Sequence, residues 1–354
     1  MSGQCDVAST TGVAEVQASL LDTVRSTTNL VYETVRTVSR ETPLLTSPAL
    51  DEVAGRQLFV KAESLQYTGY FKLRGAFYRL KQLQPAQRRN GVVAFSSGNF
   101  AQGLARAGQL LDVPVTIVMP PNVPELKIRG TKRYGARVVV AEADGRPREV
   151  IAAERAAQLS ASEGLTLLHP FDDSDVVLGH SSLGTELLRQ LETLGGGRPL
   201  DTLLVPAGGG GLAAGVALAL RAHGSTTRLI AVEPAGYDDL ARSLAAGERH
   251  RNGAPSPTLC DALQANSPGA VPFSVLQRTL SGALNVTDEE VRFAMRAAVE
   301  SLKLVLEPSG ASALAAALAA ASRGLDLGQR VGVICSGGNI AAEDFASLLS
   351  EARH

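Results

Sequence analysis

The stretch LLVPAGGGGLAAGVALALRAHG, residues 203–224, decides the fold. Its apolar start predicts a buried β-strand, and its Ala-, Leu- and Val-rich end predicts an apolar helix. Between them stand four glycines, Gly208, Gly209, Gly210 and Gly211. Glycines lose much backbone freedom on folding, which a chain tolerates where the backbone must come very close to something. Free N–H groups at a helix start can cradle an anion, so a phosphate cradle is one interpretation and a tight strand-to-helix turn is the other.

The same order of strand and helix recurs along the chain. Short apolar runs alternate with helical patterns nearly throughout, which is typical of an α/β fold with mainly parallel sheets. Continuous Val/Ile/Leu runs indicate strands that are buried on both faces. The predicted strands cover residues 58–62, 92–97, 115–120, 136–142, 165–170, 202–208, 228–234, 282–287 and 330–338. The clearest predicted helices cover residues 146–163, 291–304 and 311–322, and Thr287 with Glu290 forms a capping box before the second of them.

The composition limits the class of protein. A chain of 354 residues has room for two domains, and its 34 basic and 35 acidic residues argue against a dedicated nucleic-acid binder. Cys5, Cys260 and Cys335 include no CxxC pair, so we expect no disulfide framework and no zinc site, which fits a cytoplasmic protein. No run is typical of a signal peptide or a membrane span. Residues 1–25 are weakly patterned and predict a tail or a loosely docked helix.

A lysine with aromatic neighbours stands in TGYFKLRGAFYRL, residues 68–80. Lys72 follows Tyr70 and Phe71 directly. A lysine in an apolar pocket has a lowered pKa and becomes a nucleophile. The alternative is an amphipathic helix from which Lys72 extends to water. This stretch alone does not decide between a nucleophile and a surface side chain.

Two further strand ends carry polar residues. One reads Ser96-Ser97-Gly98-Asn99 before a predicted helix, and its hydroxyls and N–H groups suit a carboxylate, or else form an ordinary helix cap. The other reads Ser336-Gly337-Gly338-Asn339, which alone is often just a turn. Together, a nucleophilic lysine, a phosphate cradle, a carboxylate loop and a polar strand end are the parts needed to bind pyridoxal phosphate and an amino acid.

Eight stretches in the same order resemble the fold type II pyridoxal-phosphate enzymes, the group of threonine dehydratase, serine racemase and their relatives. They lie between about residues 40 and 345 and are ETPLL (41–45), KAESLQYTGYFKLRGA (61–76), SSGNFAQG (96–103), HPFDD (169–173), VPAGGGGLAAG (205–215), VEP (232–234), LKLVLEPSGASALAA (302–316) and CSGGN (335–339). The resemblance implies two open, twisted, mainly parallel sheet domains with the cofactor in the cleft between them, and a homodimer. Residues 26–88 and 172–354 would form the large domain, and residues 89–171 the small domain that carries the Ser-Ser-Gly-Asn loop.

The resemblance also implies roles for single residues around the cofactor. Lys72 matches the Schiff-base lysine, and Phe71 packs near the cofactor ring. Asn99 matches the residue that binds the ring hydroxyl, and Ser336 the hydroxyl that faces the pyridine nitrogen. Gly208 to Leu212 match the phosphate loop.

On the substrate side, the resemblance assigns the carboxylate of the amino acid to Ser96, Ser97, Asn99 and the backbone of Phe100. Ser97 also matches the serine that faces Lys72 across the cofactor plane in serine racemase. At two positions the sequence departs from its relatives, which usually carry Ser where Tyr70 stands and His where Phe100 stands. Two rings in these places predict an aromatic β-substituent, as in phenylserine, unless Tyr70 points into the large domain and Phe100 merely packs. Serine or threonine dehydratase is the conservative alternative.

A metal site follows only from the resemblance. Relatives use the residues that correspond to Glu233, the carbonyl of Tyr237 and Asp239. Oxygen ligands suit Mg²⁺ or Ca²⁺. The alternative is a solvated helix start with acidic residues near its positive end. His169 and His180 have no partners at the spacing of a hydrolase triad, so we interpret both as structural.

The preferred function is a β-eliminating ammonia-lyase that acts on a small-molecule amino acid, without a nucleic-acid or membrane partner. A serine facing the ring nitrogen does not hold it protonated, which disfavours transamination. A racemase that uses Ser97, a β-replacement synthase and a non-catalytic nucleotide-binding protein are the alternatives.

Overall fold

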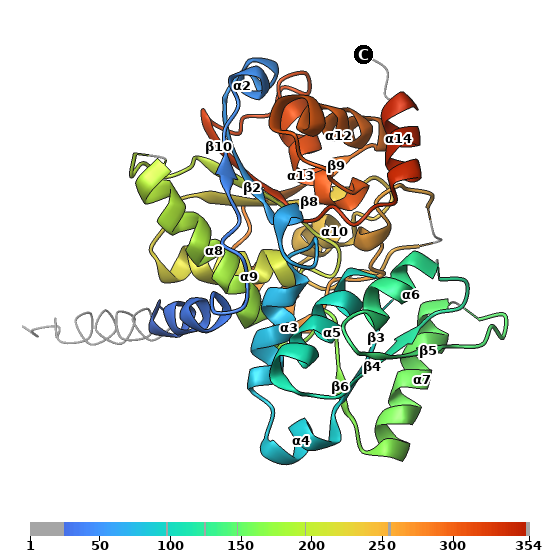
Figure 1. Ribbon diagram of the computed structural model, residues 1–354. Helices are drawn as coiled ribbons and strands as arrows, with labels where there is room; N and C mark the ends of the chain where they lie inside the picture. Colours follow the sequence, from blue (N-terminus) through green and yellow to red (C-terminus); the bar gives the residue numbers. More distant parts are fainter. Residues whose placement is uncertain are drawn as a thin grey trace, which may run out of the picture.

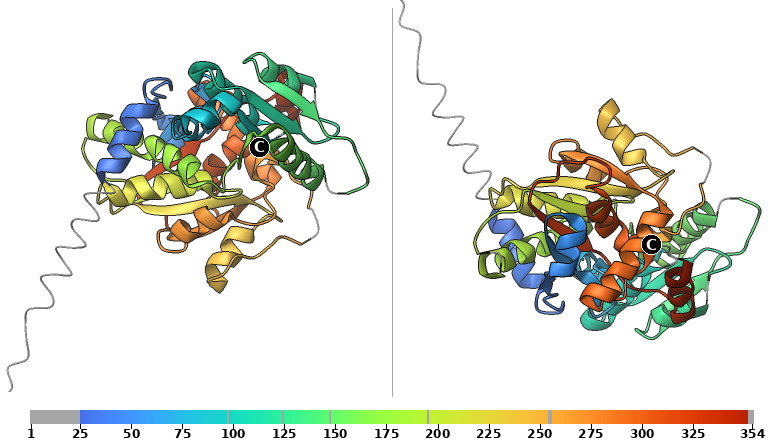
Figure 2. Two further views of the ribbon diagram at one scale, coloured as in Figure 1. Left: turned by 90° about the horizontal axis from the view of Figure 1, so that it is seen from below. Right: turned by 90° about the horizontal axis from the view of Figure 1, so that it is seen from above.

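The chain forms two sheets, each covered by helices, with the smaller sheet beside the larger one (Figures 1 and 2). The computed structural model describes residues 25–96, 98–123, 125–146, 148–194, 196–253 and 256–351. Ser97, Cys5 and all but the last residue of the predicted tail 1–25 lie outside the described residues. Residues 25–35 are helical.

The larger sheet has the strand order β1-β2-β10-β7-β8-β9, and the smaller sheet has the order β5-β4-β3-β6. All neighbouring strands are parallel except β1 and β2, so the predicted α/β class is confirmed. The strands are β1 (Leu44–Leu45), β2 (Gln57–Ala62), β3 (Val92–Phe95), β4 (Val115–Met119), β5 (Arg137–Val140), β6 (Thr166–Leu168), β7 (Thr202–Pro206), β8 (Arg228–Pro234), β9 (Gly282–Val286) and β10 (Arg330–Cys335). Each predicted strand is present, whereas β1 is too short to leave a periodic pattern in the sequence.

The helices connect the strands in the manner of parallel sheets. They are α2 (Pro48–Ala54), α3 (Lys72–Lys81), α4 (Pro85–Asn90), α5 (Asn99–Leu111), α6 (Glu125–Lys132), α7 (Arg148–Glu163), α8 (Ser174–Leu194), α9 (Gly211–Ala222), α10 (Asp239–Ala246), α11 (Ala270–Leu276), α12 (Asp288–Leu302), α13 (Pro308–Ala319) and α14 (Ala342–Glu351), with short 3₁₀ helices η1 (Glu63–Leu65) and η2 (Asp261–Leu263). The capping box is confirmed, because Thr287 Oγ1 accepts from Glu290 N (3.2 Å) and the Glu290 carboxylate accepts from Thr287 N (2.8 Å). Among the described helices, none is long and apolar enough to cross a bilayer.

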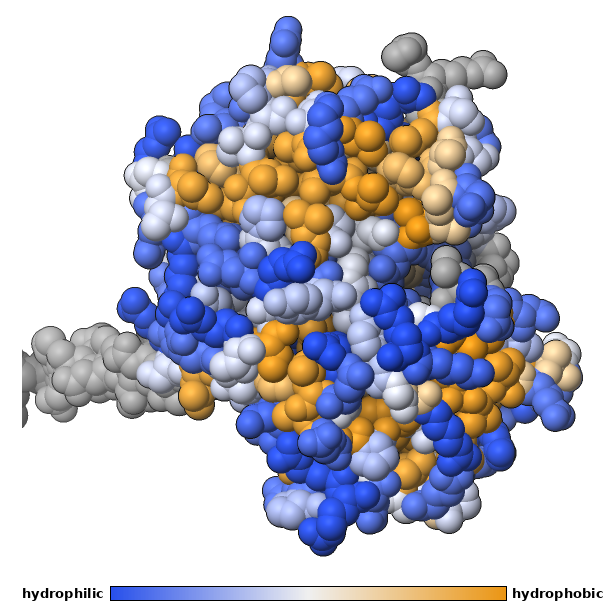
Figure 3. All heavy atoms as spheres, viewed as in Figure 1, coloured by the Kyte–Doolittle hydropathy of each residue, from blue (hydrophilic) through white to orange (hydrophobic). Residues whose placement is uncertain are grey.

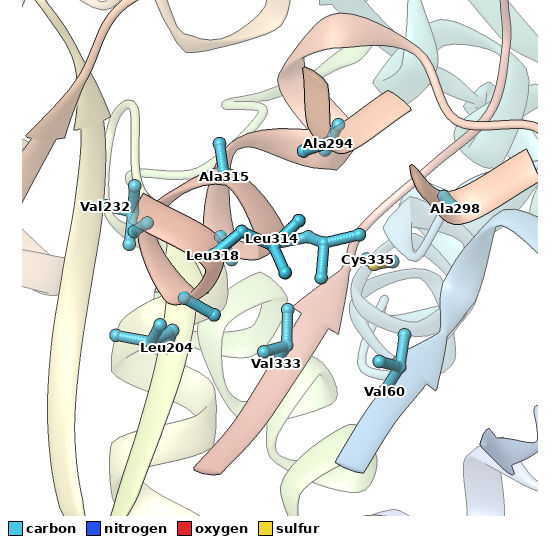
Figure 4. Packing of buried hydrophobic residues seen from close by; sticks show 14 of the residues in the cluster. Val60, Leu204, Val232, Ala294, Ala298, Leu314, Ala315, Leu318, Val333 and Cys335 are labelled. Carbon is cyan, nitrogen blue, oxygen red and sulfur yellow. The ribbon is translucent and has the colours of Figure 1, made fainter. Parts of the chain in front are cut away.

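The larger sheet is buried on both faces, as its continuous apolar strands predict. On β7, Leu204 faces the side covered by α12 and α13, where it joins Leu314 and Leu318 (Figure 4). Its neighbours Leu203 and Val205 face the other side, which α8 and α9 cover. The small side chains of α13 let that helix lie close to the strands.

Helix α3 joins the two halves of the molecule, because its first residues belong to different hydrophobic cores. Phe71, just before the helix, packs in the core of the larger sheet, whereas Leu73 packs with the strands and helix α5 of the smaller sheet. Lys72 lies between them and therefore stands where the two cores meet.

Candidate active site

Lys72 begins helix α3, and the residues before it are attached to the end of β10. Phe71 N donates to Ser336 O (3.2 Å), and Tyr70 forms an antiparallel bridge with Gly337. The Lys72 side chain is half-buried, and its Nζ lies 5.0 Å from the centre of the Phe71 ring and 5.8 Å from that of Phe100. This backbone attachment holds the lysine at the junction between the sheets.

The ammonium group of Lys72 lacks an opposite charge. Its Nζ donates to the carbonyl of Pro170 (3.2 Å), and no carboxylate of the described residues forms an ion pair with it. Burial, without a compensating charge, lowers the pKa of Lys72 to about 8. A substantial fraction of the amine is therefore neutral near physiological pH, as a nucleophile requires.

The Pro170 carbonyl is held in place by its neighbours in the loop 169–172. His169 Nδ1 accepts from Asp172 N (2.9 Å) and more weakly from Phe171 N (3.4 Å), and the imidazole lies edge-on to both Phe95 and Phe171. Burial keeps the pKa of His169 below its ordinary value, which favours the neutral ring that can accept at Nδ1. The loop therefore fixes the acceptor that Lys72 faces.

His180 is a second buried imidazole next to this junction. Its ring lies edge-on to Phe71 at 4.9 Å between centres, and neither nitrogen has a hydrogen-bond partner in the described part of the chain. Burial, and after it the charge of Lys72, hold the pKa of His180 well below its ordinary value. The backbone of Gly211 raises this pKa, but by less than burial lowers it. His180 is consequently a neutral packing group between α3 and α9, where Gly75 and Gly215 leave space for it.

The glycine loop between β7 and α9 has the shape that an anion cradle requires. Gly210 has φ +85°, in the left-handed region that favours glycine, and it precedes α9 without a capping side chain. A Cβ on Gly208 would lie 3.0 Å from Leu263 Cα, and one on Gly209 would lie 2.3 Å from the Phe171 ring. The helix start thus offers uncapped N–H groups over a surface where larger residues do not fit, which suits a phosphate group. Leu212 is buried in the first turn of α9.

Three loops that are distant in sequence meet beside Lys72 through amide side chains. Asn339 Nδ2 donates to Asn99 Oδ1 (2.7 Å) and to Thr68 O (2.9 Å). Asn99 Nδ2 in turn donates to Glu307 Oε1 (2.9 Å). The structure therefore brings together the predicted residues Lys72, Asn99 and Ser336, since Phe71 N is bonded to Ser336 O in the same loops.

Glu307 is a member of this site that the sequence interpretation missed. Its carboxylate is buried at the start of α13, and burial, aided by the charge of Asp261, raises its pKa to about 8. The signal that could have found it is the single acid in LKLVLEPSG, residues 302–310, directly after a run of three apolar residues. At neutral pH Glu307 is mainly protonated, so it presents a neutral carboxylic acid to Asn99.

The residues predicted to bind the substrate lie on both sides of this junction. Ser96 Oγ accepts from Gly98 N (3.4 Å), and Phe100 is buried in the core of the smaller sheet. Tyr70 is buried as well, and its hydroxyl lies 3.4 Å from Ser336 Oγ. Because Ser97 is outside the described residues, its predicted place opposite Lys72 stays a prediction.

The predicted metal ligands form a pair of buried carboxylates at the start of α10. Glu233 accepts from the backbone N of Leu240 and of Ala241, both at 2.9 Å. Asp239 Oδ1 accepts from Asn252 Nδ2 (2.6 Å), whereas Oδ2 has no partner among the described residues. Burial raises the pKa of Glu233 to about 8 and that of Asp239 to about 6, as expected for buried acids without a cation.

This arrangement fits a hard cation, because one buried carboxylate oxygen remains free. Tyr237, whose carbonyl is the third predicted ligand, is also buried. The described residues contain no cluster of three or more His, Cys, Asp or Glu that could bind a metal, and the predicted set needs only two carboxylates besides a carbonyl. The site for Mg²⁺ or Ca²⁺ stays a proposal.

Cysteine chemistry does not contribute to this site. Cys260 and Cys335 are free thiols buried in the core of the larger sheet. Burial raises the pKa of each to about 12, which keeps both protonated. Among the described residues, Lys72 is accordingly the candidate nucleophile of this site.

Comparisons with known proteins agree with this geometry. The family described as "Pyridoxal-phosphate dependent enzyme" matches residues 35–337. The L-threo-3-hydroxyaspartate ammonia-lyase of Pseudomonas sp is 42% identical over 314 residues, which cover 88% of this chain and 93% of that protein. The serine racemase of Dictyostelium discoideum is 34% identical over 312 residues, with 88% and 93% covered. The solved structure of T.th. threonine deaminase has a TM-score of 0.82 and 39% identity, with 89% and 98% covered.

A half-buried lysine, a glycine loop that suits an anion and two mainly parallel sheets are typical of enzymes that bind a phosphorylated cofactor. The chain belongs to the family of pyridoxal-phosphate-dependent enzymes, of fold type II, in the branch of the threonine and serine dehydratases and serine racemases. Its cofactor is pyridoxal phosphate, and the prediction of a pyridoxal-phosphate-dependent ammonia-lyase is confirmed.

Proposed function

We propose that the enzyme removes water and ammonia from a β-hydroxy-α-amino acid and releases a 2-oxo acid. The observation that carries this proposal is the environment of Lys72, whose Nζ faces a carbonyl rather than a carboxylate and whose pKa is lowered to about 8. When bound, the cofactor supplies a sink for the electron pair that remains when the Cα proton leaves. Lys72 is the residue that we assign to bind the cofactor and to take that proton.

The proton transfers can be stated atom by atom. The neutral Lys72 Nζ takes the proton from Cα as a general base. The C–O bond at Cβ breaks, and the hydroxyl leaves as water with the proton that Lys72 Nζ took from Cα, which returns the lysine to its neutral form. The enamine that remains is hydrolysed to the 2-oxo acid and ammonia. Pro170 O accepts from Lys72 Nζ, so it orients the amine.

The remaining site residues hold the reactants in place. We assign the phosphate to the N–H groups from Gly208 to Leu212, the ring hydroxyl to Asn99 and the pyridine nitrogen to Ser336. Phe71 packs beside the ring. For the substrate carboxylate we assign the Ser96, Ser97 and Asn99 loop with the backbone of Phe100. A serine at the ring nitrogen leaves that nitrogen unprotonated, which favours elimination over transamination.

We propose L-threo-phenylserine as the favoured substrate, with phenylpyruvate as its product. Phe100 supports this choice, because its ring lies 5.8 Å from Lys72 Nζ at a position where relatives usually carry His. An offset contact between the Phe100 ring and the phenyl group of the substrate would add about 0.5–1.5 kcal/mol to the binding free energy, beyond the contribution of buried apolar area. The predicted substrate contact of Tyr70 has less support, since its hydroxyl faces Ser336.

A second candidate substrate carries a carboxylate at Cβ, as in 3-hydroxyaspartate. The relative from Pseudomonas sp is named for that substrate. Lys127 Nζ lies 2.8 Å from Asp261 Oδ2 and 4.0 Å from the position that a Cβ on Gly98 would take, beside the substrate loop. This lysine could exchange Asp261 for a substrate carboxylate. L-threonine and L-serine dehydration, and serine racemisation through Ser97, are further alternatives.

A substrate panel decides among these candidates. We expect faster oxo-acid release from L-threo-phenylserine than from L-threonine, L-serine or L-threo-3-hydroxyaspartate. The variant Phe100→His should lower the preference for phenylserine over threonine by roughly 2- to 12-fold, the range that ring contact implies. Lys127→Met serves as the matched variant and should leave that ratio unchanged. Faster release from hydroxyaspartate, lost in Lys127→Met, would replace phenylserine with the acidic substrate.

We also propose that the enzyme is a homodimer, as the family resemblance implies, and that it is located in the cytoplasm. Figure 3 shows apolar surface over the larger-sheet end of the molecule. The large apolar side chains that are exposed include Phe293 of α12 at 37%, Val305 at 48% and Val53 of α2 at 51%. Exposed apolar patches often mark association surfaces. Sedimentation equilibrium should give twice the 36.9 kDa chain mass, and a monomer at micromolar concentration would refute the dimer.

A further inference from the structure

Tyr70 stands two residues before Lys72 and pairs with Gly337, in the loop that follows strand β10. Its side chain is 2% exposed and packs in the core of the larger sheet. A Cβ on Gly337 would lie 1.5 Å from a carbon of the Tyr70 ring, so the ring occupies space that only glycine leaves open. The Phe71 ring lies 4.9 Å away between centres. The tyrosine is thus held firmly between its neighbour in sequence and the loop after β10.

The hydroxyl of Tyr70 is directed at one polar group, Ser336. The two hydroxyl oxygens lie 3.4 Å apart, and both side chains are buried. Burial raises the pKa of Tyr70 well above its ordinary value, so the phenol keeps its proton at working pH. As the structure stands, Ser336 Oγ donates to Tyr70 Oη. A phenol that stays protonated can donate in the other direction once the serine proton is directed elsewhere, because each hydroxyl is both a donor and an acceptor.

A serine hydroxyl that serves a pyridine nitrogen must donate its own proton to that nitrogen. Its oxygen is then free to accept a hydrogen bond from another group. Tyr70 Oη is within reach of that oxygen, and a hydroxyl that accepts while it donates becomes a stronger donor, because hydrogen bonds in a chain polarise one another. The serine that relatives usually carry at position 70 is too short to extend across the same distance.

We propose that Tyr70 is a positioning residue that acts on the cofactor through Ser336, as the outer member of a Tyr70–Ser336–pyridine nitrogen chain of hydrogen bonds. No proton is transferred along this chain. Tyr70 orients the Ser336 hydroxyl and polarises it, so the electronic state of the ring depends on a residue that does not touch it. The inference rests on the proposed assignment of Ser336 to the pyridine nitrogen.

The test uses the full-length protein loaded with pyridoxal phosphate that carries ¹⁵N at the ring position. Tyr70→Phe removes only the hydroxyl and keeps the ring that packs on Gly337. Tyr78→Phe is the matched control, since Tyr78 is a buried tyrosine of helix α3 that packs in a different core with Val31 and Val35. Ser336→Ala and the double variant Tyr70→Phe/Ser336→Ala complete a double-mutant cycle.

We expect the ¹⁵N resonance to move in Ser336→Ala and, by a smaller amount in the same direction, in Tyr70→Phe. It should stay in place in Tyr78→Phe, and Tyr70→Phe should add nothing in the Ser336→Ala background. The affinity for the cofactor, followed by fluorescence, should fall roughly 3- to 10-fold in Tyr70→Phe. Tyr70→Ser, which restores the residue of the relatives, should give the same resonance as Tyr70→Phe.

The outcomes separate this inference from the assignment beneath it. If Ser336→Ala moves the resonance and neither Tyr70 variant does, the role of Tyr70 is refuted and the Ser336 assignment stands. If no variant moves it, the assignment fails and the inference fails with it. An equal effect of Tyr70→Phe with and without Ser336 would show that the tyrosine acts by packing, which also refutes the inference.

Discussion

Lys61 and Lys72 are both enclosed by protein, yet their surroundings differ in charge. Lys61, on β2, is fully buried and donates to Glu186 Oε1 (2.5 Å), Thr42 O (2.6 Å) and Gln190 Oε1 (2.8 Å). Lys72, at the start of α3, donates to a single backbone carbonyl. The first lysine thus has an opposite charge in contact and the second has none.

The region around Lys61 is a closed network of four buried charges. Arg74 contacts the carboxylates of both Glu63 and Glu186, so two positive and two negative groups neutralise one another. Burial lowers the pKa of Lys61, but Glu186 and Glu63 oppose that shift. At Lys72 burial acts alone. Burial therefore lowers the pKa of both lysines, and the counter-charge distinguishes Lys61 from Lys72, for which we propose the reactive role.

The largest expected effect is on catalysis at Lys72. Lys72→Ala should lower turnover at least ~10³-fold, because it removes the covalent attachment and the general base together. The free energy of unfolding of the cofactor-free protein should change by less than about 1 kcal/mol, since no ion pair is broken. Turnover and urea denaturation check the two statements, and a variant that keeps a tenth of the activity would contradict the assignment.

At Lys61 we expect the opposite result, a large loss of stability with little change in turnover. Lys61→Met leaves Glu186 with Arg74 alone and removes the donor to Thr42 O and Gln190, so the free energy of unfolding should fall by ~3–5 kcal/mol. Turnover per folded molecule should stay within about threefold, because Lys61 is not part of the proposed chemistry. Lys81→Met is the control on the exposed end of α3 and should change stability by less than ~0.5 kcal/mol. Equal losses in both variants would remove the distinction between the two regions.

Glu307 is the acidic counterpart of Lys72, because its carboxyl group is buried and has no ion-pair partner among the described residues. Its pKa of about 8 in the folded protein exceeds the ordinary 4.5. Its contribution to stability is therefore fully present below about pH 4.5 and is lost as pH rises through about 8. Glu307→Gln keeps an acceptor for Asn99 and cannot ionise. The variant should gain stability relative to the unmutated protein across this range, on the order of a few kcal/mol.

Urea denaturation of the cofactor-free protein at several pH values measures this gain. Glu248→Gln, at a side chain that is 79% exposed, should give a curve parallel to that of the unmutated protein. If the free energy of unfolding of Glu307→Gln also runs parallel to that of the unmutated protein across these pH values, Glu307 is ionised in the folded protein and has a positive partner. That result would contradict the raised pKa.

A smaller effect is expected at the loop that holds the acceptor of Lys72. His169→Asn places an amide oxygen where Nδ1 stands and can still accept from Asp172 N, whereas His169→Gln places its oxygen at the Nε2 position. Loss of about one to two hydrogen bonds should weaken cofactor affinity roughly 5- to 10-fold in the Gln variant and less than about twofold in the Asn variant. Fluorescence titration with pyridoxal phosphate checks this, and equal losses would assign His169 to packing.

The local patterns of the sequence were sufficient to predict the strands and the glycine turn between β7 and α9, because each depends on neighbours along the chain. The role of Lys72 was predicted only from several motifs together and from the family resemblance, and it stays a prediction. The network around Lys61 was not predictable, since Lys61 and Glu186 are 125 residues apart and meet only when β2 and α8 pack. The same holds for Glu307, which reaches Asn99 across 208 residues. For Tyr70, the pattern indicated an unusual aromatic residue but not the direction of its hydroxyl, which depends on the loop after β10.

Mapping of the cofactor lysine tests the central claim most directly. The protein loaded with pyridoxal phosphate is treated with borohydride, which makes the link between lysine and cofactor permanent, and its peptides are then identified by mass spectrometry. We expect the added mass on Lys72 and none on Lys61, in nearly every molecule. Cofactor attached to another lysine, or absent from a protein that still releases oxo acid and ammonia, would contradict the account.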